Sequence, residues 1–332
     1  MSDALLAAYD AVLFDLDGTV YHGTRVIPGA PETLRAVREH GTAVRFVTNN
    51  ASKPPEDVVA HLTGLGMPAD PGEVHTSAQA AAALLKERLE PGSVVLVVGT
   101  ESLAALVASA GLRPVRTIAE AAGDVAGVVQ GHSPATTWAD LVEAALAIRA
   151  GAVWVASNVD PTLPSERGLL PGNGSMVAAL RTATDREPLV AGKPAPLLFD
   201  TAARTAGAHR PLVVGDRLDT DIAGAVAAGL DSLVVLSGVT TPATLLGASP
   251  AERPTYVAAD LTGLGQRADL LAIGGKAGWR VTHSDDVLVV SGTGEPLDLL
   301  RALCPVAWES GTTGTRGDGE AARAALTELG LV

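Results

Sequence analysis

Short apolar runs alternate with longer stretches rich in Ala, Leu and Glu along most of this chain of 332 residues. Such runs, bounded by Gly, Asp or Asn, are typical of βαβ units and a parallel sheet. The predicted strands are Ala11–Phe14, Ala43–Val47, Val94–Val98, Val125–Val129, Ala152–Ala156, Leu212–Val214 and Ser232–Leu236. The predicted helices are Pro31–His40, Pro55–Leu65, Ala78–Leu89, Ser102–Ala110, Trp138–Ala150, Ser175–Thr184, Pro196–Ala206 and Thr220–Ala228. So many parallel strands would strain one open sheet, which predicts an α/β fold with two sheets.

The part of the chain after Leu264 follows a different pattern. Two strand-like runs, GWRVT and DVLVV, precede a predicted helix at Pro296–Leu303, and an Ala-rich helix is predicted at the end. The Gly/Thr-rich segment Gly311–Gly319 is predicted to be a flexible loop, with a regulatory contact as the alternative. These features indicate a small appended α/β subdomain, and its role is not evident from the sequence.

Composition excludes several classes of protein. The chain has 24 Lys and Arg against 37 Asp and Glu, a formal charge of −13, which argues against a broad nucleic-acid surface because that surface must neutralise phosphates. With 47% hydrophobic residues it is a packed globular protein, and its apolar runs are too short to span a bilayer. The N-terminal MSDALLAAYD lacks a basic and apolar leader, and Cys304 is the single cysteine. We therefore expect a cytoplasmic protein without disulfides.

Two carboxylates follow the first predicted strand, in the sequence VLFDLDGTV. Asp15 and Asp17 lie at the carboxyl end of this strand, where open α/β sheets bind ligands, and Gly18 permits a tight turn. This pattern predicts a functional pair of acids. The alternative is that both acids merely flank a turn.

A second acidic group, GDRLDTD, follows the predicted strand Leu212–Val214. One of its acids could cap a helix, but Asp216 would lie at the same edge of the sheet as Asp15. Two carboxylates about 4 Å apart repel by roughly 4 kcal/mol at an effective dielectric constant near 20, so converging acids require a cation. Oxygen ligands favour Mg²⁺, and the predicted metal residues are Asp15, Asp17 and Asp216.

Two further segments contain groups suited to a phosphate. The predicted strand Ala43–Val47 is followed by Thr48 and Asn49, whose hydroxyl and amide can donate hydrogen bonds to phosphoryl oxygens. Lys193 stands alone among uncharged residues in VAGKP. Taken alone, the first segment is typical of a strand-to-helix turn and Lys193 of a surface charge.

The order of these segments, DLDGTV, FVTNN, GKP and GDRLDTD, resembles the four signature motifs of the haloacid dehalogenase superfamily over about 260 residues. The resemblance implies that Asp15 is the nucleophile that forms an aspartyl-phosphate and that Asp17 is the general acid and base. Because dehalogenase members lack the second acid, it also implies a phosphatase rather than a dehalogenase.

The same resemblance implies roles for the other motif residues. Thr48 and Asn49 would bind the phosphate, and Lys193 would balance its charge. Asp216 would bind Mg²⁺, with Asp221 in support.

The long interval between the second and third motifs implies an inserted α/β cap, as in subfamily IIA. Within it, SNVDPTLP and LPGNGS resemble a stretch of that subfamily, so Asn158 and Asp160 are predicted to reach a substrate hydroxyl. An Asx turn without substrate contact is the alternative. The predicted domains are the core at residues 1–87 and 188–264, the cap at 88–187 and the appended segment at 265–332.

Subfamily IIA implies a Mg²⁺-dependent phosphatase of small phosphorylated metabolites that can pair as a homodimer. Glycerol 3-phosphate is the first expected substrate, with phosphoglycolate, pyridoxal phosphate and sugar phosphates as alternatives. One departure is VVQGHS, where the glycerol 3-phosphate and phosphoglycolate members usually have V-V-x-G-x-D.

Single segments of the sequence are also compatible with three other functions. Ser133 in QGHSPA faintly resembles a serine-hydrolase elbow, but Pro134 lacks the N–H that an oxyanion hole needs. Dinucleotide binding through Gly172–Gly174 or Gly292–Gly294 lacks a third glycine. A non-catalytic sugar-phosphate sensor would keep the fold without turnover.

Overall fold

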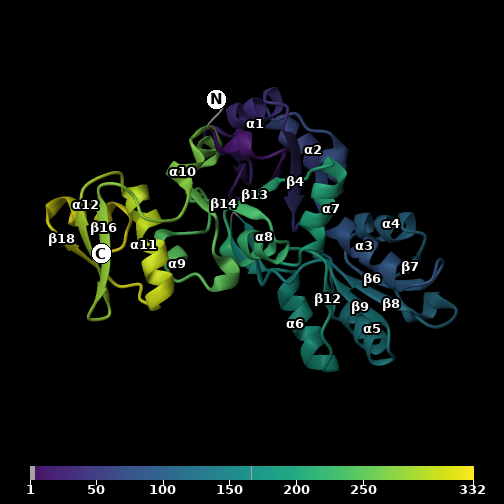
Figure 1. Cartoon of the computed structure of the whole chain (residues 1–332). Helices are drawn as coiled ribbons and strands as arrows, with labels where there is room; N and C mark the ends of the chain where they lie inside the picture. The colour runs from purple at the N-terminus through teal and green to yellow at the C-terminus, as the bar shows by residue number, and fades with distance from the viewer. Residues whose placement is uncertain (1–3, 166) are drawn as a thin grey trace. The chain divides into compact units, whose positions relative to one another are not determined.

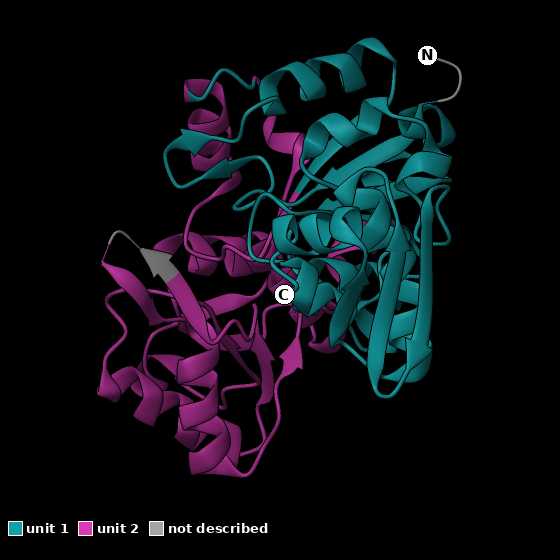
Figure 2. Ribbon diagram, turned by 90° about the vertical axis from the view of Figure 1, so that its left-hand side faces the viewer, with its two compact units in different colours: residues 1–46, 65–67, 202–332 teal, residues 47–64, 68–201 magenta. Residues whose placement is uncertain are grey.

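The computed structural model describes residues 4–165 and 167–332, in which the chain forms two compact units. Unit 1 contains residues 1–46, 65–67 and 202–332, and unit 2 contains residues 47–64 and 68–201 (Figure 2). Figure 1 labels the helices and strands along the chain. No helix in the described ranges combines the length and the apolar character needed to cross a bilayer.

Parallel strands in unit 1 follow one another in the order β15-β14-β13-β1-β4. Their bounds are β1 (Ala11–Phe14), β4 (Ala43–Thr48), β13 (Pro211–Gly215), β14 (Asp231–Val235) and β15 (Tyr256–Ala258). Phe14 of β1 is in register with Val214 of β13 and Phe46 of β4. Every residue of β1 and β13 is buried, as expected for central parallel strands. Because parallel strands end at the same edge, the residues after β1 and β13 meet there.

The other elements of the core are short connections and helices. The helices are α1 (Ala30–Glu39), α7 (Leu197–Ala206), α8 (Ala223–Ala227), α9 (Pro242–Leu246) and α10 (Ala268–Leu271). The antiparallel strands β2 (Tyr21–His22) and β3 (Arg25–Val26) form a hairpin after β1. The predicted helix Thr220–Ala228 is in fact a π-helical turn, η4 (Leu218–Ile222), followed by α8. Pi turns are rare and often occur at functional sites, and this one carries Asp221.

Unit 2 contains a second parallel sheet with the order β12-β9-β8-β6-β7. Its strands are β6 (Val94–Val98), β7 (Arg113–Val115), β8 (Gly127–Gln130), β9 (Val153–Ala156) and β12 (Leu189–Val190). Its further elements are α2 (Pro55–Gly64), β5 (Val74–Thr76), α3 (Ser77–Arg88), α4 (Glu101–Ser109), α5 (Trp138–Arg149), β10 (Thr162–Ser165), β11 (Gly168–Pro171) and α6 (Asn173–Thr184). Val128, Ile148 and Leu180 of this unit share one hydrophobic cluster, which holds α5 and α6 on the sheet.

The last elements of unit 1 form a three-stranded sheet with two helices. They are β16 (Trp279–Ser284), β17 (Val287–Gly292), α11 (Pro296–Ser310), β18 (Thr315–Asp318) and α12 (Glu320–Glu328), shown in yellow and yellow-green in Figure 1. The prediction of a flexible loop at Gly311–Gly319 is wrong in part, because β18 pairs in parallel with β17. The predicted end of the helix at Leu303 is also wrong, because α11 continues through Pro305. Pro305 cannot donate to the carbonyl oxygen of Arg301, and the N–H of Gly274 donates to that oxygen instead, over 3.1 Å.

These C-terminal elements share a hydrophobic core with the parallel sheet of unit 1. Ile222 and Val234 lie in the same cluster as Leu288, Leu299 and Leu303. The indole Nε1 of Trp308 also donates to the carbonyl oxygen of Leu245 over 3.0 Å. The appended segment is therefore packed on the core sheet.

The predicted α/β class and the two parallel sheets are confirmed. The bounds predicted for β1 and β6 are those observed. The bounds of the other predicted strands differ from the observed ones by one or two residues at one or both ends.

Candidate active site

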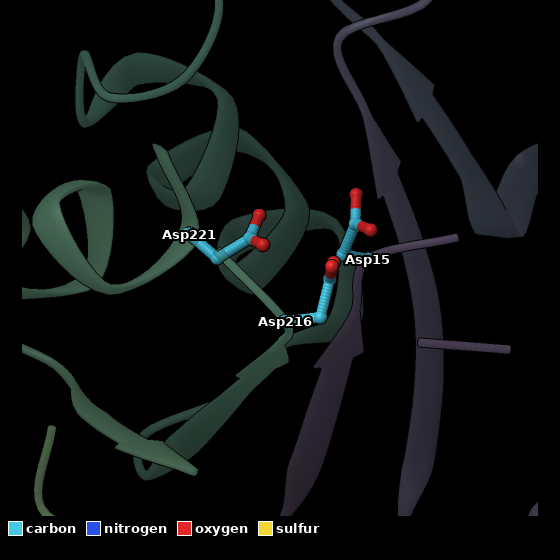
Figure 3. Close-up of side chains that lie close together, drawn as sticks. All are labelled: Asp15, Asp216 and Asp221. Atoms are coloured by element: carbon cyan, nitrogen blue, oxygen red, sulfur yellow. The ribbon is translucent and has the colours of Figure 1, made fainter. Parts of the chain in front are cut away.

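Three carboxylates from two parts of the sequence meet at the carboxyl edge of the core sheet. Asp15, Asp216 and Asp221 each offer one oxygen, and these oxygens all lie within 4.8 Å of one another (Figure 3). Asp15 follows β1, Asp216 follows β13, and Asp221 lies in η4. Asp216 and Asp221 are buried, so water does little to screen their charges. The sequence prediction that Asp15 and Asp216 converge is thus confirmed by their geometry.

A backbone N–H and a side-chain hydroxyl fix the orientation of Asp216. Its Oδ2 accepts a hydrogen bond from the N–H of Val239 over 2.7 Å, and its Oδ1 accepts one from Oγ1 of Thr19 over 3.4 Å. Two glycines leave room for this carboxylate: a Cβ would lie 2.3 Å from Oδ2 at Gly18 and 2.0 Å from it at Gly238. The site therefore depends on glycine at both positions.

Asp221 is held in a similar way. Its Oδ2 accepts a hydrogen bond from the N–H of Arg217 over 3.1 Å, and a Cβ at Gly215 would lie 2.5 Å from the same oxygen. The π turn of η4 places this side chain beside Asp216.

The three acids fit a divalent cation. At separations below 5 Å each ionised pair repels by on the order of 3 kcal/mol at an effective dielectric constant of 20. A bound cation removes this cost, and a set of carboxylate oxygens suits Mg²⁺. Asp15, Asp216 and Asp221 are the residues that would hold it. Asp221, predicted only in a supporting role, belongs to the cluster itself.

Asp17 lies outside this carboxylate cluster. Its side chain is 57% exposed, and its Oδ1 lies 3.8 Å from Nδ1 of His22 in the hairpin. Nε2 of the same imidazole lies 2.8 Å from the carbonyl oxygen of Ser237, to which it donates when protonated. Burial and the neighbouring charges of Asp15 and Asp17 raise the pKa of the Tyr21 phenol. Asp17 is thus not among the three clustered carboxylates, and its predicted roles as a metal residue and as the general acid and base stay predictions.

The predicted phosphate-binding residues lie together in unit 2. Lys193 is 2% exposed, and its Nζ donates to the carbonyl oxygen of Val47 over 3.1 Å. It is therefore a buried cation, and the interpretation of a surface charge is wrong. Thr48 is buried at the end of β4, and its Oγ1 accepts the N–H of Asn50 over 3.1 Å, which leaves the hydroxyl hydrogen for another acceptor.

The predicted cap residues Asn158 and Asp160 also lie here. Asn158 is 4% exposed; its Nδ2 donates to the carbonyl oxygen of Asn49 over 2.7 Å, and its Oδ1 accepts the N–H of Asp160 over 3.2 Å. This is an Asx turn, and the predicted contact of Asn158 and Asp160 with a substrate hydroxyl stays a prediction. Asp160 is partly buried, and both its carboxylate oxygens accept from Nδ2 of Asn49 over 3.2 Å.

The segments behind two of the alternative functions are a tight turn at Ser133 and the N-terminus of α6 at Gly172–Gly174. Oγ of Ser133 accepts the N–H of Ala135 over 3.2 Å, which is an ST turn. A Cβ at Gly172 would lie 2.4 Å from the carbonyl oxygen of Asp160, and one at Gly174 would lie 2.1 Å from that of Val159. These glycines therefore pack against the loop that carries Asp160.

Comparison with known proteins gives the same assignment. Residues 12–113 match a family described as haloacid dehalogenase-like hydrolase, and residues 190–264 match a related description, HAD-hydrolase-like. D-glycerol 3-phosphate phosphatase of Mycobacterium tuberculosis is 51% identical over 311 residues, which cover 91% of this chain and 86% of that protein. The chain belongs to the haloacid dehalogenase-like hydrolase family.

Solved structures of the family extend this result. A glycerol phosphate phosphatase from Mycobacterium tuberculosis in complex with magnesium has a TM-score of 0.94 and 50% identity, covering 99% of both chains. The 4-nitrophenylphosphatase of Thermotoga maritima has a TM-score of 0.72 and 30% identity, covering 80% of this chain and 99% of its own. The resemblance to subfamily IIA is confirmed by these neighbours.

The C-terminal segment matches a different description. Residues 276–331 match a GCN5-related N-acetyltransferase like domain. This family description covers β16 to α12, which lie within the appended segment predicted at residues 265–332.

Several contacts of the hydrolase site had no signal in the sequence. His22 contacts Asp17 through its imidazole, Ser237 donates to the carbonyl oxygen of Gly18 through its hydroxyl, and Val239 donates to Asp216 through its backbone N–H. A backbone N–H is common to every residue, and single His and Ser residues form no motif, so only Gly238 could indicate this loop. The glycine marks the close approach that the Asp216 carboxylate requires.

Proposed function

We propose that this chain is a Mg²⁺-dependent phosphatase that hydrolyses glycerol 3-phosphate to glycerol and phosphate. The observation that carries the proposal is the cluster of Asp15, Asp216 and Asp221 in a phosphoric monoester hydrolase of this family. The 51% identity to a D-glycerol 3-phosphate phosphatase supports the choice of substrate.

The reaction proceeds in two displacements. An oxygen of Asp15 attacks phosphorus, the bond from phosphorus to the glycerol oxygen breaks, and Asp17 gives its proton to the departing oxygen. Asp17 then removes a proton from a water molecule, which attacks the aspartyl-phosphate and restores the Asp15 carboxylate. The exposure of Asp17 supports this role, because the carboxyl group must reach both the leaving group and water.

Positive charge balances the phosphoryl oxygens. The Lys193 ammonium, which donates to the carbonyl oxygen of Val47, would place its positive charge against these oxygens. The Thr48 hydroxyl supplies a further hydrogen bond. Bound Mg²⁺ would neutralise the acid cluster and stabilise negative charge on the phosphoryl group.

We further propose the domain division 1–87, 88–187, 188–264 and 265–332, with residues 88–187 acting as the cap that selects the leaving group. The partly buried Asp160 is the proposed cap contact to a substrate hydroxyl. We propose a cytoplasmic location, a small phosphorylated metabolite as the partner and no nucleic-acid or membrane partner. A homodimer is proposed as well, because members of subfamily IIA can pair.

A screen of phosphate release tests the proposal. Purified protein is incubated with glycerol 3-phosphate, phosphoglycolate, pyridoxal phosphate, sugar phosphates and nucleotides, each with Mg²⁺ and with EDTA. We expect the highest kcat/KM for glycerol 3-phosphate and no release in EDTA. Selectivity for another substrate would contradict the substrate, and binding without release in Mg²⁺ would favour the non-catalytic sensor. Light scattering on a size-exclusion column measures the oligomeric state.

A further inference from the structure

The carboxamide of Asn49 binds the backbone of Lys193 at two points. Its Oδ1 accepts the N–H of Lys193 over 2.8 Å, and its Nδ2 donates to the carbonyl oxygen of Lys193 over 3.0 Å. The carboxamide thus makes the same pair of hydrogen bonds to residue 193 that the backbone of a neighbouring β-strand would make. Only one orientation of the carboxamide satisfies both bonds, because a flipped amide would face a donor with a donor and an acceptor with an acceptor.

Gly192, the residue before the lysine, leaves room for the carboxamide of Asn49. A Cβ at Gly192 would lie 2.5 Å from Oδ1 of Asn49 and 2.5 Å from the carbonyl oxygen of Ser157. Any side chain at position 192 would therefore separate the amide from the lysine backbone. The GKP motif therefore needs a glycine at this position for a steric reason, which is not evident from the sequence.

Asn49 is itself fixed on its other sides. Its carbonyl oxygen accepts from Oγ of Ser77 over 2.6 Å and from Nδ2 of Asn158 over 2.7 Å. Its Nδ2 also contacts both carboxylate oxygens of Asp160. The oxygen of this carboxamide accepts the N–H of Lys193, and its NH₂ group donates to Lys193 and Asp160, so both N–H donors are used within the protein.

We propose that Asn49 is a positioning residue, which sets the place of the Lys193 ammonium through the backbone of residue 193 and does not use its side chain to bind phosphate. This inference rests on the proposed function, in which Lys193 contacts the phosphoryl group. The same amide joins the Asp160 loop to Lys193, so one residue aligns the charge-balancing cation with the proposed substrate contact.

A double-mutant cycle separates positioning from direct binding. The variants are Asn49→Ala, Lys193→Ala and the pair, and the readouts are kcat, KM for glycerol 3-phosphate, the affinity for inorganic phosphate by calorimetry in Mg²⁺, and Tm. We expect Asn49→Ala to lower kcat by about 100-fold, as a displaced catalytic group does. In the Lys193→Ala background the same change should lower kcat and phosphate affinity by less than about twofold, because the group it positions is gone.

Asn173→Ala is the matched control. Asn173 is 2% exposed, and its Nδ2 donates to the carbonyl oxygens of Asn158, over 2.7 Å, and Gln130, over 3.4 Å, rather than to residue 193. Its loss should lower Tm, and any effect on kcat should be the same with and without Lys193.

The other outcomes are equally informative. Losses that multiply in the Asn49 and Lys193 pair would overturn the inference and make Asn49 a direct phosphate ligand. A lower Tm with unchanged kcat in Asn49→Ala would overturn it in favour of a structural role. Two other results would contradict the proposed function itself. They are a wild-type protein that releases no phosphate and a Lys193→Ala variant with full activity.

Discussion

The N–H of Val239 donates a hydrogen bond to Oδ2 of Asp216 over 2.7 Å, which joins the loop after β14 to a proposed metal ligand. Oγ of Ser237 in the same loop donates to the carbonyl oxygen of Gly18 over 2.9 Å. The loop therefore contacts both acidic motifs of the core. The loop thus acts on the site through the N–H of Val239 and the hydroxyl of Ser237.

Gly238→Ala should abolish Mg²⁺-dependent activity, because a Cβ would lie 2.0 Å from Oδ2 of Asp216. We expect at least a 100-fold loss of kcat/KM, as the carboxylate or the loop must move by about 1 Å. Kinetics over a range of Mg²⁺ concentrations measures the effect. Gly247→Ala is the control, since a Cβ there would lie 3.7 Å from the nearest atom. Equal activity of the two variants would contradict this account of the loop.

Asp221→Asn should raise Tm in EDTA and reduce the rise in Tm that Mg²⁺ produces. Removing one charge from the cluster relieves repulsion on the order of 3 kcal/mol, and the amide oxygen can still accept the N–H of Arg217. Calorimetry of both proteins with and without Mg²⁺ measures this. An undiminished effect of Mg²⁺ in the variant would mean that Asp221 does not help to hold the ion.

Asp15→Asn should eliminate turnover and leave the fold intact, since an amide is a poor nucleophile of nearly the same size. Phosphate release and far-UV circular dichroism measure the two properties. Retained activity would refute the assignment of the nucleophile. Loss of both signals would instead indicate that Asp15 is needed for folding, and Asp15→Glu would then test the carboxylate.

Cys304 should resist thiol reagents in the native protein. Burial raises the pKa of its thiol to about 12 from an ordinary value of 9.0, so the reactive thiolate is scarce at pH 8. Because the folded state holds this proton more tightly, the associated stability is present below pH 9 and decreases as pH rises from 9 toward 12. Labelling should follow unfolding in guanidinium at the midpoint seen by circular dichroism, since Cys304 belongs to the cluster shared with Val234. Labelling at a lower midpoint would show that the appended segment unfolds separately.

Much of the core fold could be predicted because buried parallel strands are continuous apolar runs. Ala11–Phe14 and Val94–Val98 have this pattern and were placed with the observed bounds. β18 could not be found in this way, since Thr315–Asp318 contains an arginine, a glycine and an aspartate and pairs through its backbone with β17 alone. The sequence predicts too early an end for α11, because a proline removes a backbone donor and so favours the end of a helix. The N–H of Gly274, which is distant in the sequence, takes the place of the donor that Pro305 lacks.

The candidate site likewise contains some residues whose place the sequence predicts and others whose place it does not. Asp15 and Asp216 could be placed together because each follows a parallel strand, and strand ends share an edge. The sequence predicts only a supporting role for Asp221. It predicts an ordinary helix at Thr220–Ala228 and not the π turn that brings Asp221 to the cluster. The engagement of Asn49 with Lys193 depends on atoms 144 positions apart in the sequence, and no spacing rule anticipates it.

The shared hydrophobic cluster also bears on how shorter phosphatases of this family can exist. The Thermotoga maritima protein aligns over nearly all its length yet leaves a fifth of this chain without a counterpart. Leu245 and Val257 are fully covered here, in a cluster to which α11 contributes Leu303. A protein that ended before α11 would have to place hydrophilic residues on that flank or cover it by other means, and this chain cut at the same point would be prone to aggregate.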